Sequence, residues 1–228
     1  NLTLNQSGTT FTATGSITAS GVLTINAGTF DADDETIILS GTSTPFVNNG
    51  TFTASTSTIR YTGAGATNIT ADTYYHLEIK PASGSPTYTL ASGTINVEGN
   101  YVNGDGTNAV TTTATTNDPT FNVDGDLTVA ASSVFIASDS ATFSIAGNYV
   151  NAGTFTHSSG TEIFDGTGTH TITTGGTGAA GGWTVANAGD TSYNGTYTAS
   201  GTMNGQTKYT NGSRWLYYNY EEMMDQYQ

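Results

Sequence analysis

Apolar and small polar residues alternate in short runs along most of the chain. Runs such as 22–25, 36–39 and 94–97 carry Val, Ile or Leu at alternate positions, and Gly, Asn or Ser separates one run from the next. A period of two predicts half-buried β-strands joined by turns. No stretch of any length has helical periodicity, and the segment 221–228 suffices for one helical turn at most. We therefore expect an all-β protein.

The chain contains an internal duplication. Residues 47–70 match residues 150–173 at an offset of 103 without a gap, and 12 of these 24 positions are identical, including Val, Phe and Ile. A shorter unit, Gly-Asn-Tyr-Val-Asn, occurs at 99–103 and again at 147–151. Aligned at Val97, Val123 and Ile145, related units lie 26 and 22 residues apart. Such repeats predict a parallel β-helix, or β-solenoid, in which stacked coils pair their backbones and enclose a narrow apolar core.

Two segments resemble a known class of surface protein. Residues 147–156, with the sequence GNYVNAGTFT, and 166–173, with GTGTHTIT, are similar to the repeats of filamentous-haemagglutinin-type and autotransporter-type adhesins. The resemblance extends over roughly residues 1–180. It implies a right-handed parallel β-helix exposed on a bacterial cell surface, and it brings no catalytic residue. A β-sandwich would also have many short strands, but it does not require internal self-similarity.

The composition changes after the Gly-rich stretch 175–182. Residues 183–228 contain both Trp and seven of the 13 Tyr, with Asn-Gly turns between short β runs. This pattern predicts a small antiparallel module, so we expect a solenoid domain at 1–182 and an aromatic-rich cap or contact module at 183–228. Aromatic side chains dominate interface hot spots, and three tyrosines this close on one strand cannot all point inward. The predicted interface residues are Trp215, Tyr217, Tyr218 and Tyr220; the alternative is that they form the core of the module.

Charge is sparse and one-sided. Four Lys and Arg residues face 18 Asp and Glu residues, which gives a formal net charge of −14. A nucleic-acid binder needs a basic face, and anionic membrane surfaces attract basic segments, so neither partner is expected. No run approaches the roughly 18 apolar residues of a membrane span, so no membrane insertion is expected. The absence of Cys excludes disulfides and thiolate metal sites.

The densest acidic cluster is Asp31, Asp33, Asp34 and Glu35. Hard oxygen ligands at alternate positions suit Ca²⁺, although the cluster lacks the Gly and the distal Glu of a recognised calcium loop. The two interpretations are a structural calcium site and a solvated turn. We expect no other cofactor.

No residue set in the sequence predicts catalysis. A glycosidase needs two carboxylates across a sugar, and a polysaccharide lyase needs a basic residue near an acidic sugar, but none of the four basic residues stands beside an acidic pair. The leading hypothesis is an extracellular structural or adhesive protein, a rod or filament subunit that self-associates through β-edges and its aromatic C-terminus. The alternatives are a phage tail-fibre or spike segment that binds host glycans and, third, a polysaccharide-active enzyme.

Overall fold

The computed structural model describes residues 1–175, 183–185, 195–203, 206–210 and 214–216. The chain forms two compact units, Asn1–Gly178 and Ala179–Gln228. Every regular element of the described residues is a β-strand, which confirms the all-β class. None of these elements is a helix that could cross a lipid bilayer. The predicted boundary at residue 182 lies outside the described residues.

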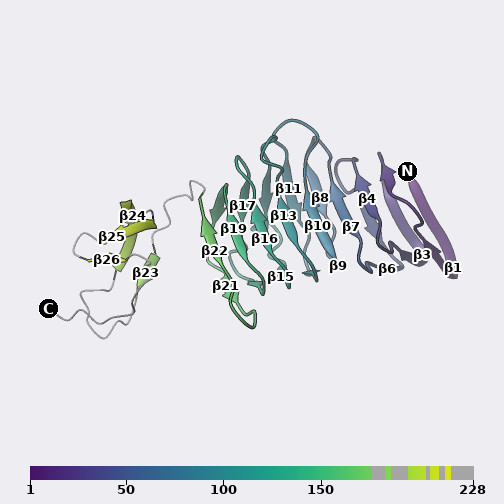
Figure 1. Ribbon diagram of the computed structural model, residues 1–228. Coiled ribbons are helices and arrows are strands. Elements are labelled where there is room, and N and C mark those ends of the chain that lie inside the picture. The colour runs from purple at the N-terminus through teal and green to yellow at the C-terminus, as the bar shows by residue number, and fades with distance from the viewer. Residues whose placement is uncertain (176–182, 186–194, 204–205, 211–213, 217–228) are drawn as a thin grey trace. The chain divides into compact units, whose positions relative to one another are not determined.

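One strand from each turn of the first unit belongs to an eight-stranded parallel sheet, here called the long sheet (Figure 1). Its strands, in order, are β2 (Ile17–Ala19), β4 (Thr36–Leu39), β7 (Thr58–Tyr61), β10 (His76–Ile79), β13 (Tyr101–Asn103), β16 (Leu127–Val129), β19 (Tyr149–Asn151) and β22 (Ile172–Thr174). Each strand pairs with its counterpart one turn later, as Leu77 does with Tyr101 and Tyr101 with Leu127. The unit is therefore a parallel β-solenoid of about eight turns, as the repeats predict.

Two five-stranded parallel sheets form the other faces from β8 onward. The second sheet contains β8 (Thr67–Ile69), β11 (Thr87–Leu90), β14 (Thr111–Thr113), β17 (Val134–Ile136) and β20 (Thr154–Thr156). The third sheet contains β9 (Thr73–Tyr74), β12 (Thr94–Val97), β15 (Thr120–Val123), β18 (Thr142–Ile145) and β21 (Thr161–Phe164). The first turns instead share a four-stranded sheet of β1 (Leu2–Thr12), β3 (Leu23–Asp31), β5 (Phe46–Asn48) and β6 (Thr51–Thr53).

The predicted alignment of three repeat units is confirmed in the third sheet. Val97 pairs with Val123, and Val123 pairs with Ile145. The spacing of 26 and then 22 residues therefore corresponds to successive turns, and the extra residues are accommodated outside the strands.

Aromatic side chains fill the core of the later turns. Phe121 stacks on Phe143 with ring centroids 5.3 Å apart, and Phe135 stacks on Phe155 with centroids 5.7 Å apart. Tyr101 packs edge-on against Phe121 at 5.0 Å. Because parallel pairing places like residues above one another, the second and third sheets each contribute stacked rings to a continuous core.

Glycines stack at the corner that leads into the long sheet. The amide of Gly125 donates to the carbonyl of Gly99, and the amide of Gly147 donates to that of Gly125, at 3.0 and 3.1 Å. A Cβ on Gly125 or Gly147 would collide with the backbone of the turn below. This close approach explains the Gly that begins the repeated Gly-Asn-Tyr-Val-Asn unit.

The residue after each of these glycines forms a ladder of side chains along the solenoid. The Asn100 side-chain oxygen accepts from the Asp126 amide at 2.9 Å, and the Asp126 carboxylate accepts from the Asn148 amide at 2.8 Å. The Asn148 oxygen then accepts from the Thr171 amide at 2.9 Å. Asn or Asp at this place therefore satisfies a backbone donor that the corner would otherwise leave unpaired.

The second unit contains a four-stranded antiparallel sheet, in agreement with the predicted module type. Its strands are β23 (Trp183–Val185), β24 (Gly195–Met203), β25 (Gln206–Thr210) and β26 (Trp215–Leu216). Trp183 pairs with Tyr197, and Thr210 pairs with Trp215.

Candidate functional site

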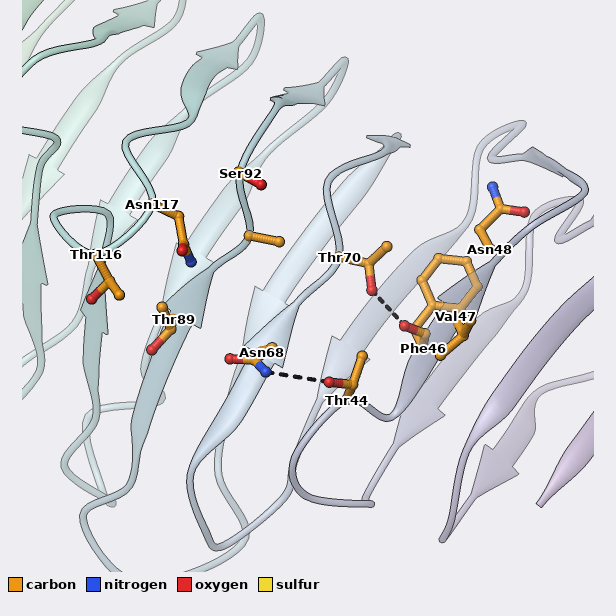
Figure 2. Close-up of a pocket in the computed structure, with 11 residues that line it drawn as sticks. Thr44, Phe46, Val47, Asn48, Asn68, Thr70, Thr89, Ser92, Thr116 and Asn117 are labelled. Atoms are coloured by element: carbon orange, nitrogen blue, oxygen red, sulfur yellow. Dashed lines mark hydrogen bonds between the residues drawn. The ribbon is translucent and has the colours of Figure 1, made fainter.

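A shallow groove of about 570 Å³ runs across several turns of the solenoid, where the second sheet turns toward the third (Figure 2). Its lining residues are all uncharged and come from four stretches of the chain. They are Thr44, Phe46, Val47, Asn48, Asn68, Thr70, Thr89, Ala91, Ser92, Thr116 and Asn117. The groove follows the stacking direction of the coils rather than the direction of a single strand.

The groove is open because neighbouring corners differ in length. The corners 70–72 and 91–93 connect the second and third sheets in three residues each, whereas the corner 114–119 takes six. Gly93 makes its short corner with φ +117°, a backbone conformation that L side chains rarely adopt. The longer corner carries Thr116 and Asn117 at one end of the groove, and residues 44–48 line the other end.

Several lining side chains are held by hydrogen bonds between turns. The Asn68 amide donates to the Thr44 hydroxyl at 3.2 Å, and the Thr70 hydroxyl donates to the Phe46 carbonyl. The Asn117 amide donates to the carbonyl of Leu90 at 2.8 Å and fixes the longer corner over the neighbouring turn. These side chains are therefore ordered before any ligand arrives.

Other hydroxyls in the groove are free. Among the residues that the structure describes, the side chains of Thr89, Ser92 and Thr116 have no hydrogen-bond partner, and Ser92 and Thr116 are exposed. No lining residue carries a formal charge. The nearby Asp72 carboxylate accepts from the side chain of Asn48 at 2.7 Å and from the amide of Thr73 at 2.8 Å. The groove therefore offers hydroxyl and amide groups without an ion.

The predicted calcium cluster lies at the turn between β3 and β4. The Asp31 carboxylate accepts from the amide of Asp33 at 3.0 Å and from the hydroxyl of Ser55 at 2.8 Å. Asp33 has φ +49°, and the Glu35 amide donates to the Ala32 carbonyl. These contacts give Asp31 a role in shaping the turn. Within the described part of the chain, no group of three or more His, Asp or Glu side chains is placed to hold a metal ion; calcium binding by Asp31, Asp33, Asp34 and Glu35 stays a prediction.

The predicted interface residues are only partly described. Trp215 lies in β26, opposite Thr210 of β25. Tyr217, Tyr218 and Tyr220 lie outside the described residues. Their role in an interface stays a prediction.

Two carboxylates, Asp118 in the longer corner and Asp139 one turn later, meet on the surface of the solenoid. The Asp118 carboxylate accepts from the hydroxyl of Ser138 at 2.8 Å, and this hydrogen bond lowers the pKa of Asp118. The charge of Asp118 in turn raises the pKa of Asp139. Asp118 also accepts from the Asp139 backbone amide at 3.2 Å. The pair shapes a surface turn, and neither carboxylate lines the groove.

The groove is a feature that sequence reasoning missed. The only signal for it was the difference in spacing, 26 against 22 residues, which indicates that corners vary in length but not which corner grows. Comparisons of this chain with protein-family models, with curated proteins and with solved structures find no match.

Proposed function

We propose that this protein is a rod segment of an extracellular structural or adhesive assembly, related in kind to the filamentous-haemagglutinin-type and autotransporter-type adhesins that its repeats resemble. The observation that carries the proposal is the uninterrupted long sheet of eight parallel strands over a continuous core. With neighbouring strands about 4.8 Å apart, that sheet extends for about 34 Å along the stacking direction. Backbone ladders on every face make such a stack resistant to bending, which suits a spacer or filament subunit.

A place outside the cell is proposed on the resemblance of residues 147–156 and 166–173 to surface-adhesin repeats. A net charge of −14 keeps copies soluble and attracts cations. The uncharged outer groove gives the rod a surface on which a ligand can be held without a catalytic group. We further propose that copies join through exposed β-edges and through the aromatic C-terminal residues Trp215, Tyr217, Tyr218 and Tyr220.

Electron microscopy and light scattering of the purified full chain test assembly. We expect oligomers or filaments whose mass falls toward that of single chains in the double variant Trp215→Ala/Tyr217→Ala. Tyr75→Ala, which removes a partly exposed aromatic from the solenoid, is the control and leaves assembly unchanged. A wild-type chain that stays monomeric at all concentrations, or a double variant that assembles like wild type, contradicts the proposal.

A second candidate function is a spike or tail-fibre segment that binds host glycans. The groove favours it, because hydroxyl and amide groups from several turns converge there. A compact trimer in solution in place of filaments would support this candidate over the first.

A further inference from the structure

The polar groups of the groove repeat along the solenoid. Thr44, Asn68 and Thr89 come from successive turns: the Asn68 amide bonds to Thr44, and Asn68 pairs with Thr89 in the second sheet. Neighbouring strands lie about 4.8 Å apart, so a ligand along this row meets a polar side chain at every turn. An extended polymer with hydroxyl groups on each unit has the matching pattern.

We propose that the groove binds a neutral polysaccharide whose chain lies along the solenoid. The proposal deepens the adhesive function proposed above and rests on it. The free hydroxyls of Thr89, Ser92 and Thr116 bind sugar hydroxyls directly, and the Asn68 side-chain oxygen, whose own amide is held by Thr44, accepts from them.

The charge distribution selects a neutral chain over an acidic one. No lining residue is basic, so a uronate or sulfate group would find no counter-ion in the groove. The net charge of −14 also repels a polyanion. This repulsion is strongest at low ionic strength. A neutral polysaccharide meets neither obstacle.

Hydrogen bonds between turns lower the entropic cost of binding in the groove. Thr70 is held by the Phe46 carbonyl and Asn117 by the Leu90 carbonyl, so these side chains lose little further freedom when a ligand arrives. Each turn contributes few contacts because the groove is shallow. Affinity therefore grows with the number of turns that the chain covers, and long polymers bind more tightly than short oligosaccharides.

Affinity electrophoresis of the full chain in native gels tests the proposal. The gels contain dextran, mannan, galactan or laminarin as neutral polymers, and alginate or polygalacturonate as acidic ones. We expect retardation by at least one neutral polymer and none by the acidic ones. Thr89→Glu, which places a charge in the groove, weakens retardation at least tenfold, and Ser92→Glu does the same. Thr128→Glu is the matched control, since Thr128 has similar exposure on the long sheet, and it binds like wild type.

Retardation by no neutral polymer overturns the proposal, as does equal retardation by the acidic ones. Equal loss in Thr128→Glu overturns it too, because the effect would then come from overall charge. Circular dichroism and light scattering of the same samples show whether folding and assembly persist. A wild-type chain that assembles but is retarded by no neutral polymer would refute binding in the groove and leave the rod function standing.

Discussion

The two copies of the internal duplication have different surroundings. In the first copy, residues 58–61 form β7 inside the long sheet, where Ile59 and Tyr61 are 2% and 0% exposed. In the second copy, residues 161–164 form β21 of the third sheet. There Glu162 pairs in register with the buried Phe143, and Phe164 is 51% exposed. The same stretch of sequence therefore occupies different faces of the solenoid.

The difference shows that the duplicated unit, which is about one turn long, is not tied to one set of faces of the solenoid. Any face of the solenoid can contain a strand of this unit, because the strands of every face require the same alternation of inward-pointing and outward-pointing residues. The two copies are enclosed to different degrees, because different numbers of strands pair with them. β7 is paired on both sides, by β4 and β10, whereas within the described residues β21 pairs with β18 alone. Glu162 stands at the position of Ile59 on that less enclosed strand.

The largest effect on the free energy of unfolding is expected from substitutions that exchange the residue types of Ile59 and Glu162. Ile59 lies between Ile37 and Leu77 in the long sheet. Ile59→Glu buries an unpaired carboxylate there, and we expect it to cost more than about 4 kcal/mol of unfolding free energy. The reverse change, Glu162→Ile, adds apolar contact and raises stability by about 1 kcal/mol. Urea unfolding followed by circular dichroism measures both, and equal effects of the two variants would remove the contrast between the copies.

A smaller contrast is expected between Tyr61 and Phe164, which occupy equivalent positions of the two copies. Tyr61→Ala leaves a cavity in the closed core and costs about 3–5 kcal/mol, whereas Phe164→Ala removes a half-exposed ring and costs about 1 kcal/mol or less. Tyr61→Phe is the control, because it keeps the ring and loses only the polar contacts of the hydroxyl with Tyr74 and Thr70. Similar losses in the two alanine variants would mean that Phe164 is enclosed as well as Tyr61.

The sequence was sufficient for the fold class and for the stacking of the later turns. Alternation specifies strands, and Val97, Val123 and Ile145 identify one column because parallel pairing repeats like residues. The sequence was not sufficient to place the duplicated unit on a face. That placement depends on the summed lengths of all corners between the two copies. Corner length produces no periodic pattern in the sequence.

The groove could not be predicted for a related reason. Thr89 and Ser92 are ordinary residues in a Thr- and Ser-rich chain. They line a site because two short corners lie beside the longer one at 114–119. Nor did composition reveal that Asp31 shapes its turn, because that role depends on hydrogen bonds from the Asp33 amide and the Ser55 hydroxyl.

The smallest effect on stability is expected from a change of pH, and this effect has opposite signs for Glu78 and Glu162. Burial by itself raises the pKa of Glu78, but hydrogen bonds from Lys80 at 2.8 Å and Arg60 at 2.6 Å outweigh burial and leave this pKa below 4.5. Burial dominates at Glu162 and raises its pKa above 4.5, although His157 lies 2.6 Å from one carboxylate oxygen. The other oxygen is buried and has no partner among the described residues.

The two shifts give opposite slopes of stability against pH. Glu78 binds protons less readily in the folded chain. Its contribution to the free energy of unfolding is therefore present above the unfolded pKa and is lost as the pH falls through the folded pKa. Glu162 binds protons more readily in the folded chain. Its contribution to the free energy of unfolding is therefore present at low pH and is lost as the pH rises through the folded pKa. We expect Glu78→Gln to be less stable than wild type near pH 7 and Glu162→Gln to be more stable, each by less than about 1 kcal/mol because both carboxylates are partly solvated. Urea unfolding between about pH 3 and pH 7 measures the differences, which should shrink in acid for both variants. A Glu162→Gln chain that is less stable than wild type at neutral pH would show that the pair with His157 outweighs burial at this position.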